Sequence, residues 1–151
     1  MTVFSTQRWF AVSQAVLFAA FSQAEYLARW WGPAGFTNQF EQFDFRAGGD
    51  WRFTMIGPDG VHYPNQSRFV YIHAPSRIVI RHLNLPYFDL TVTLEPHAQG
   101  TWLYWQQAFA DDQVAAAVCA IVEPANEQNL DRLQQVLVQM GAADAAGESM
   151  A

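Results

Sequence analysis

The feature that most constrains the fold is a long central stretch in which apolar and polar side chains alternate. Over residues 36–109 the apolar positions recur with a period of two, which is typical of β-strands with one buried face. Glycine and proline turn signals divide this stretch into short segments, so we expect about six strands in meander order. Because the connections between consecutive strands are short, the pattern predicts an antiparallel sheet.

With one further strand at the N-terminus, the expected strands cover residues 2–9, 38–46, 50–56, 61–72, 77–84, 87–95 and 101–109. Two short helices are expected between the first two strands, over residues 14–21 and 22–30, with Ser13 and Ser22 as their N-caps. Pro64 lies inside the fourth expected strand. It predicts an edge position or a β-bulge there, because proline has no N–H group for the strand ladder.

Helical spacing returns in the C-terminal third, where one apolar stripe predicts a helix over residues 125–140. The stripe consists of Leu130, Leu133, Val136, Leu137 and Met140. Asp111 and Asp112 can cap a helix start before an apolar run over residues 115–122, and Pro124 then either begins a new helix or kinks one. Within that run, Ala117, Val118 and Ile121 are expected to form part of a lid over a ligand site. We expect a single domain over residues 1–141 and a flexible tail over residues 142–151.

These elements predict an α+β fold of the helix-grip type. One amphipathic helix packs on a curved antiparallel sheet of about seven strands, and two short helices follow the first strand. The space between such a sheet and its helix is the natural place for a ligand cavity.

Several segments carry a resemblance to a known family. They are LARWWGPAGFTN (residues 27–38), FDFRAGGDWRFTMIGPDG (43–60), HYPNQSRFVYIHAPSRIVI (62–80), LTVTLEP (90–96) and NEQNLDRL (126–133). Together they resemble the bacterial AHSA1-like branch of the START/SRPBCC, Bet v 1-like superfamily, which is related to the C-terminal domain of the activator of Hsp90 ATPase. The resemblance implies a seven-stranded antiparallel sheet that grips a long C-terminal helix. It does not choose a function, because the superfamily includes carriers, cyclases, hydroxylase subunits and receptors.

Charge and composition exclude several functions. All 8 basic residues are arginine, and with 14 acidic residues the net charge is −6, so binding to nucleic-acid phosphates is not expected. Without lysine, no Schiff base can form. Cys119 is the single cysteine, and the histidines lack ligand spacing, so neither a metal nor a cofactor is expected. No apolar run reaches the ~20 residues of a membrane span. We expect a cytoplasmic protein.

Aromatic residues make up 15% of the chain, and this excess favours a cavity lined with rings for a small apolar or aromatic ligand. The candidate ligand-binding residues are Trp30, Trp31, Phe43, Phe45, Trp51, Phe53, Met55, Tyr63, Phe69, His82, Phe88, Trp105 and Leu130. Polar wall residues that could orient the ligand are Tyr63, Asn65, His82 and Gln107. The leading hypothesis is a carrier or sequestering protein without chemistry of its own.

An enzyme is the alternative hypothesis, although no catalytic constellation is evident. Glu41 alternates in phase with Phe43 and Phe45, and His82 alternates in phase with Ile80, so either side chain could enter the cavity. A cyclase or isomerase could use one of them as an acid or base. A third hypothesis is a co-chaperone-like interaction module, which the absence of a partner-binding N-terminal domain disfavours.

Two large rings predict an interface on the outer face of the sheet. Trp102 and Tyr104 alternate away from Leu103 and Trp105, at positions where relatives more often carry polar residues. Exposed rings of this kind often mark a contact surface. We therefore expect a homodimer or a crystal contact that uses them.

Overall fold

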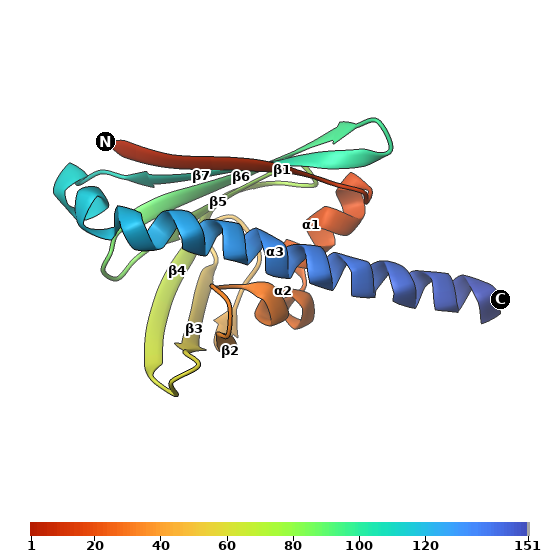
Figure 1. The fold of residues 1–151 in the computed structure, drawn as a ribbon, viewed down its shortest axis with the longest axis horizontal. Coiled ribbons are helices and arrows are strands. Elements are labelled where there is room, and N and C mark those ends of the chain that lie inside the picture. The colour runs from red at the N-terminus through yellow and green to blue at the C-terminus, as the bar shows by residue number, and fades with distance from the viewer. Residues whose placement is uncertain (151) are drawn as a thin grey trace.

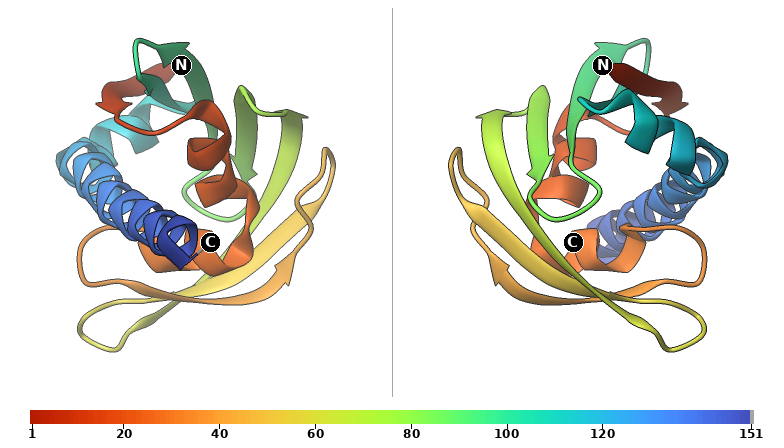
Figure 2. Two further views of the ribbon diagram at one scale, coloured as in Figure 1. Left: turned by 90° about the vertical axis from the view of Figure 1, so that its right-hand side faces the viewer. Right: turned by 90° about the vertical axis from the view of Figure 1, so that its left-hand side faces the viewer.

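A seven-stranded antiparallel sheet curves around one long helix in the computed structural model, which describes the backbone of residues 1–150 and the side chains of residues 1–141 (Figure 1). The strand order is β1-β7-β6-β5-β4-β3-β2, so the chain meanders from β2 to β7 and the first strand lies beside the last. Figure 2 shows that the sheet wraps around its concave side, where α1, α2 and α3 lie. The predicted α+β helix-grip fold is confirmed.

The strands are β1 (Thr2–Phe10), β2 (Thr37–Phe43), β3 (Asp50–Ile56), β4 (His62–His73), β5 (Arg77–His82), β6 (Phe88–His97) and β7 (Gly100–Phe109). The helices are α1 (Gln14–Ser22), α2 (Ala24–Trp30) and α3 (Asp112–Met150). Every predicted strand is present. The period of two located the strands well because one face of each is buried against the helices.

The long helix differs from the prediction at both ends. α3 begins at Asp112 and contains Pro124, which agrees with one of the two alternatives for Pro124, whereas the apolar stripe predicted a helix only over residues 125–140. Asp111 caps the earlier start, because its Oδ1 accepts the N–H groups of Gln113 (2.9 Å) and Val114 (3.3 Å). Pro124 is tolerated on the exposed side of the helix, where water can bind the carbonyl that it leaves free.

The C-terminal end also differs, because Gly141 lies inside the helix rather than ending it. The predicted flexible tail covers residues 142–151. The side chains of residues 142–150 and all of residue 151 lie outside the described part of the chain, so the flexibility of this segment stays a prediction.

The caps of the two short helices were predicted with unequal success. Ser13 caps α1, because its Oγ accepts the N–H group of Val16 at 3.2 Å. Ser22 was predicted to cap α2, and this was wrong: Ser22 is the last residue of α1, and Gln23 takes the N-cap position without a side-chain hydrogen bond. The N–H group of Gln23 also bonds to Ala19 O (3.1 Å), so a single extended residue joins the two helices.

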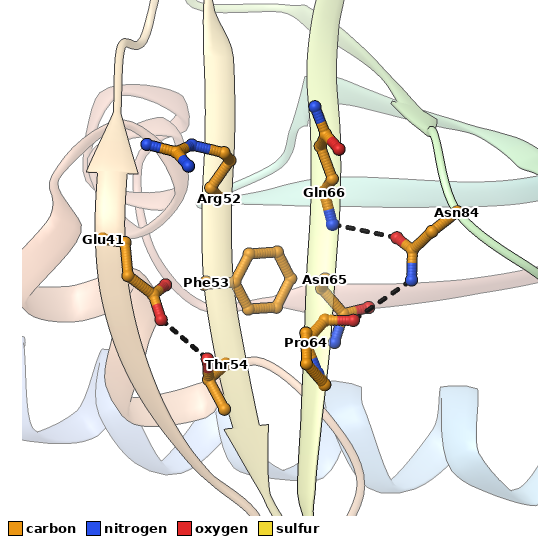
Figure 3. Close-up of a pocket in the computed structure, with 8 residues that line it drawn as sticks. All are labelled: Glu41, Arg52, Phe53, Thr54, Pro64, Asn65, Gln66 and Asn84. Atoms are coloured by element: carbon orange, nitrogen blue, oxygen red, sulfur yellow. Dashed lines mark hydrogen bonds between the residues drawn. The ribbon is translucent and has the colours of Figure 1, made fainter.

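Pro64 occupies a local edge, as the sequence predicted, although β4 lies inside the sheet. Thr54 of β3 pairs with Pro64, whereas β5 begins to pair with β4 only at Ser67. Asn84 takes the place of the missing strand: its Oδ1 accepts the N–H group of Gln66 (2.9 Å), and its Nδ2 donates to Pro64 O (3.1 Å) (Figure 3). The missing N–H group of Pro64 therefore removes no hydrogen bond between strands at this position.

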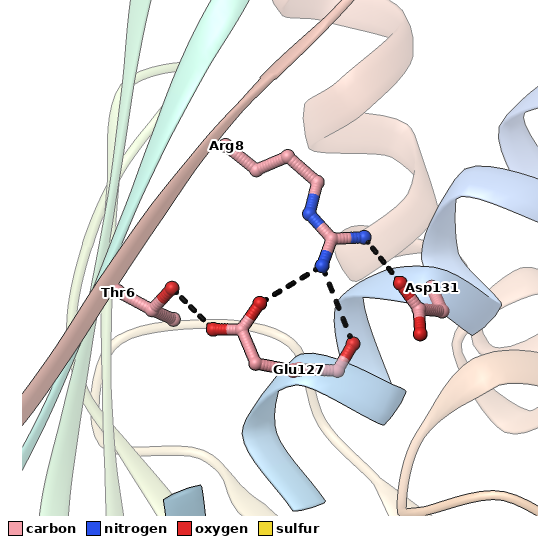
Figure 4. Close-up of polar contacts among 4 residues, drawn as sticks. All are labelled: Thr6, Arg8, Glu127 and Asp131. Atoms are coloured by element: carbon pink, nitrogen blue, oxygen red, sulfur yellow. Dashed lines mark hydrogen bonds and ion pairs between the residues drawn. The ribbon is translucent and has the colours of Figure 1, made fainter. Parts of the chain in front are cut away.

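Apolar burial holds α3 against the sheet, and ion pairs tie it to the edge strand β1. Leu130, Leu133 and Leu137 of the predicted stripe are fully buried. On the outer side of the helix, Arg8 of β1 bonds to Glu127 (2.9 Å) and Asp131 (2.7 Å) (Figure 4). Because these carboxylates are exposed, each pair contributes ~1 kcal/mol or less, and the burial dominates.

Candidate functional site

A cavity of about 240 Å³ lies between the concave face of the sheet and the N-terminal half of α3. Its aromatic wall consists of Trp31, Phe53, Phe88 and Trp105. Its aliphatic wall includes Met55, Ile80, Leu90, Ile121, Val122 and Ala125. Polar groups come from Asn65, Ser67, His82, Gln107, Asn126 and Asn129. No Arg, Lys, Asp or Glu side chain is among these described lining residues, so the cavity is suited to an uncharged molecule.

Small residues on α3 leave this space open. The helix turns Val122, Ala125 and Asn126 toward the sheet. Val122 and Ala125 have short side chains, and Asn126 reaches the sheet at one point, where its Nδ2 donates to Gln107 Oε1 at 3.1 Å. Ile121 is 70% exposed and lies at the mouth. The cavity therefore results from short side chains on the helix opposite large side chains on the sheet.

The other part of the interior is filled by aromatic rings. Trp51 is the centre of this cluster, which also contains Phe18, Phe40, Phe43, Phe45, Phe53 and Phe69. The Trp51 ring stacks on Phe53 (4.2 Å between centroids) and on Phe69 (5.7 Å). Trp31 joins the two parts, since its ring lies 5.1 Å from that of Trp51 and 5.8 Å from that of Trp105.

The structure divides the predicted site residues into two groups. Those that line the cavity are Trp31, Phe53, Met55, His82, Phe88 and Trp105. Those in the packed core, away from the cavity wall, are Trp30, Phe43, Phe45, Trp51, Phe69 and Leu130. Tyr63 joins neither group, because its side chain is 45% exposed and packs beside Phe36. The predicted polar residues Asn65 and Gln107 do line the cavity.

The sequence prediction identified only one residue of the part of α3 that closes the cavity. Ile121 lines the cavity as expected, whereas Ala117 and Val118 do not. Val122, Ala125, Asn126 and Asn129 are spaced three or four residues apart and so form one face of a helix. This signal was present in the sequence. It was overlooked because Pro124 divides the pattern, so the residues before and after it were not read as one helix face.

His82 lies at the polar side of the cavity, and each of its ring nitrogens faces an oxygen atom. Its Nδ1 lies 2.7 Å from Pro86 O, and its Nε2 lies 2.8 Å from Asn65 Oδ1. The ring stacks on Phe88, with centroids 4.7 Å apart. Burial lowers the pKa of His82, which outweighs the opposing effect of hydrogen bonds with Pro86 and Asn84. The imidazole is therefore neutral near pH 7.

A polar clamp from α3 fixes the loop that carries Trp31. The Arg132 guanidinium donates to five backbone carbonyls between 2.8 and 3.1 Å, those of Arg29, Trp31, Gly32, Pro33 and Phe36. Asn129 adds two bonds, from its Nδ2 to Trp30 O (2.9 Å) and from Gly32 N–H to its Oδ1 (3.2 Å). Burial lowers the pKa of Arg132, but an arginine stays charged. The clamp holds Trp31 at the cavity.

The sequence matches the family model described as Activator of Hsp90 ATPase homolog 1-like protein over residues 11–138. The chain belongs to this AHSA1-like family. No curated protein matches the sequence.

Solved structures confirm the AHSA1-like fold. A protein from Arthrobacter aurescens is 23% identical with a TM-score of 0.85, over 91% of this chain and 86% of that chain. A protein from Rhodobacter sphaeroides is 24% identical with a TM-score of 0.81, over 91% and 93%. An AHSA1-like protein from Aeromonas hydrophila is 17% identical with a TM-score of 0.76, over 93% and 94%. At these identities the likeness shows the Bet v 1-like/SRPBCC fold alone.

Glu41 of this AHSA1-like chain lies outside the cavity. The prediction that it could enter the cavity with Phe43 and Phe45 was therefore wrong. A β-bulge separates the Phe40–Phe53 pair from the Gln42–Arg52 pair and leaves Glu41 as the extra residue. Its carboxylate therefore lies on the outer face, where it accepts the Thr54 hydroxyl at 2.6 Å in a groove of about 330 Å³ (Figure 3). Alternation failed here because a bulge shifts the phase by one residue.

Within the described part of the chain, no helix has the length and apolar character needed to cross a membrane. The described side chains also contain no cluster of three or more His, Cys, Asp or Glu residues that could hold a metal ion.

Proposed function

We propose that this AHSA1-like protein binds a small uncharged apolar or aromatic molecule in the cavity between its sheet and α3, as a carrier or sequestering protein. The AHSA1-like/SRPBCC fold typically binds hydrophobic ligands. The observation that carries the proposal is the cavity itself, a ring-lined space of about 240 Å³ beside a closely packed aromatic core. A void of this size lined by apolar groups would cost stability without a use.

The affinity expected from such a cavity is moderate. Burying ~200 Å² of an aromatic ligand at ~25 cal/mol per Å² gives about 5 kcal/mol before association costs. Micromolar binding then requires hydrogen bonds as well, and the polar side of the cavity has groups to form them.

Binding without chemistry is favoured over acid–base catalysis by the positions of the two candidate groups. Glu41 lies on the outer face of the sheet. His82 lines the cavity, but it is the one titratable side chain among the described lining residues. An acid–base pair of the kind that a cyclase or isomerase uses is therefore not assembled there.

Calorimetric titration with 2-methoxynaphthalene and 1-decanol tests the proposal. We expect micromolar binding of at least one probe. Phe88→Ala should weaken it at least tenfold, because this ring forms part of the wall. The matched control is Tyr87→Ala, since Tyr87 is 59% exposed and does not line the cavity. Absence of binding for both probes, or equal losses in the two variants, would refute a ligand site in this cavity.

We also propose the homodimer predicted from the outer rings. Trp102 and Tyr104 of β7 stack on one another with centroids 6.3 Å apart, and Trp9 of β1 pairs with Trp102 across the strands. Sedimentation should give the mass of a dimer, and Trp102→Ser with Tyr104→Ser should give a monomer. A wild-type monomer at high concentration would reject this interface.

A further inference from the structure

Two hydrogen-bond acceptors face each other on the polar side of the cavity. The carbonyl of Pro86 can only accept, so the nearby Nδ1 of His82 carries the proton of the neutral ring. Nε2 is then an acceptor as well. It lies 2.8 Å from Oδ1 of Asn65, which is a second acceptor, with no proton between them.

Turning the Asn65 amide does not solve this mismatch. In the observed orientation its Nδ2 donates to Tyr63 O at 2.8 Å. In the opposite orientation Nδ2 could donate to His82 Nε2, but Oδ1 would then face the carbonyl of Tyr63. The contact between two acceptors would move from His82 to Tyr63 and would not disappear. With a neutral His82, the series of polar contacts from Pro86 through His82 and Asn65 to Tyr63 has three contacts but protons for only two of them, in either orientation of the amide.

The missing proton can come from the imidazole or from a molecule in the cavity. A charged imidazolium would complete the chain, but His82 is 8% exposed and the described lining residues of the cavity include no carboxylate to stabilise the charge. A donor that arrives with the ligand needs no buried charge. Because His82 and Asn65 both line the cavity, such a donor can reach them.

We propose that the ligand is an apolar molecule with a hydroxyl group, of the phenol or alcohol class, whose O–H donates to His82 Nε2 and Asn65 Oδ1. This inference rests on the proposed function of the cavity. The stacking of His82 on Phe88 fixes the plane of the imidazole, so the acceptor pair has a constant position. A ring bound between Phe53, Phe88 and Trp105 would lie beside it. A carboxylate ligand is disfavoured, since it would add acceptors and meet no cationic partner among the lining residues.

Calorimetry with two matched probes tests the hydroxyl. At pH 7.5 the unmodified protein should bind 2-naphthol about tenfold more tightly than 2-methoxynaphthalene, which has nearly the same shape but no donor. Equal or tighter binding of the methyl ether would overturn the hydroxyl inference and leave the proposed function intact. If neither probe nor decanol binds, the proposed function itself fails.

Two variants locate the preference in the acceptor pair. His82→Phe keeps a ring against Phe88 but has no Nε2, and we expect the preference for 2-naphthol to fall to about twofold or less. Asn65→Leu removes the second acceptor and provides an independent measurement if His82→Phe does not fold. Gln66→Leu is the control, because this exposed neighbour does not line the cavity. A full tenfold preference in a folded acceptor variant would show that the hydroxyl binds elsewhere and would refute the assignment.

Discussion

The space between the sheet and its helices has two ends that share strands β3 and β4, yet one end is filled by side chains and the other contains a cavity. Around Trp51, rings of β2, β3 and β4 pack together, and Phe18 of α1 contacts Phe45 in the loop after β2, with ring centroids 5.7 Å apart. Around Trp105, the sheet faces Val122 and Ala125 of α3 across an open cavity. Phe53 belongs to both ends, since it stacks on Trp51 and also lines the cavity.

This difference shows that a high aromatic content does not by itself indicate a ligand cavity. The sheet carries aromatic rings at both ends. What differs is the size of the side chains opposite them: phenylalanine on α1, and alanine, valine and asparagine on α3. An interior is normally filled to crystal-like density, so a space persists only where the covering element lacks volume.

The largest expected effect comes from breaking the filled end. Trp51→Ala should lower the free energy of unfolding by about 3–5 kcal/mol, because Trp51 is fully buried among rings. Binding should also weaken, since Phe53 and Trp31 of the cavity wall rest on the Trp51 ring. Urea unfolding and calorimetry measure the two effects. Trp102→Ala, on the outer face, should cost far less; equal losses would contradict the assigned core.

The second prediction loosens the loop that joins the two ends. Arg132→Leu removes the guanidinium bonds to five backbone carbonyls, of which Trp31 O and Pro33 O keep a second donor in Asn38 Nδ2 and Phe36 N–H. We therefore expect a loss of roughly 2–3 kcal/mol in unfolding free energy. Ligand binding should weaken at the same time, because the clamp fixes Trp31. Gln128→Ala removes only one bond to this loop, from Ala34 N–H, and should cost under ~1 kcal/mol. A smaller loss for Arg132→Leu than for Gln128→Ala would count against the clamp.

The third prediction concerns a substitution that fills the cavity with a ring, as the other end of the interior is filled. Ala125→Phe places a ring on the face of α3 that lines the cavity, and binding of 2-naphthol should fall at least tenfold. Stability should change by no more than about 1–2 kcal/mol, because the new ring occupies existing space. Ala120→Phe, on the exposed side of the same helix, is the control and should bind normally. Unchanged affinity in Ala125→Phe would place the ligand outside this cavity.

The smallest expected effect is a pH dependence that arises at the end that contains the cavity. Burial lowers the pKa of His82 in the folded state, whereas the unfolded chain takes up the proton near pH 6.5. The unfolded state therefore binds more protons as the pH falls below about 6.5, and folding stability decreases until the folded-state pKa is reached. Urea unfolding at pH 7.5 and 5.5 should show a smaller decrease in His82→Phe than in the wild type. Equal decreases would mean that His82 titrates normally.

The sequence alone determined the elements and the faces of the strands. Alternation correctly placed Leu103 and Trp105 on the opposite face of their strand from Trp102 and Tyr104, and both are buried. The apolar stripe located the packed part of α3. These features are local, because the period of the backbone fixes which side chains share a face. The family resemblance, too, rests on short segments that can be read along the chain.

The tertiary structure decided which inward residues line a cavity and which fill a core. Trp51 and Trp105 both occupy inward positions on their strands, but only Trp105 borders empty space, because only Trp105 lies opposite the short side chains of α3. The bulge at Glu41 and the contact between His82 and Asn65 also depend on pairing between strands. Volume and pairing are properties of residues far apart in the chain, and periodicity along one strand carries no information about them.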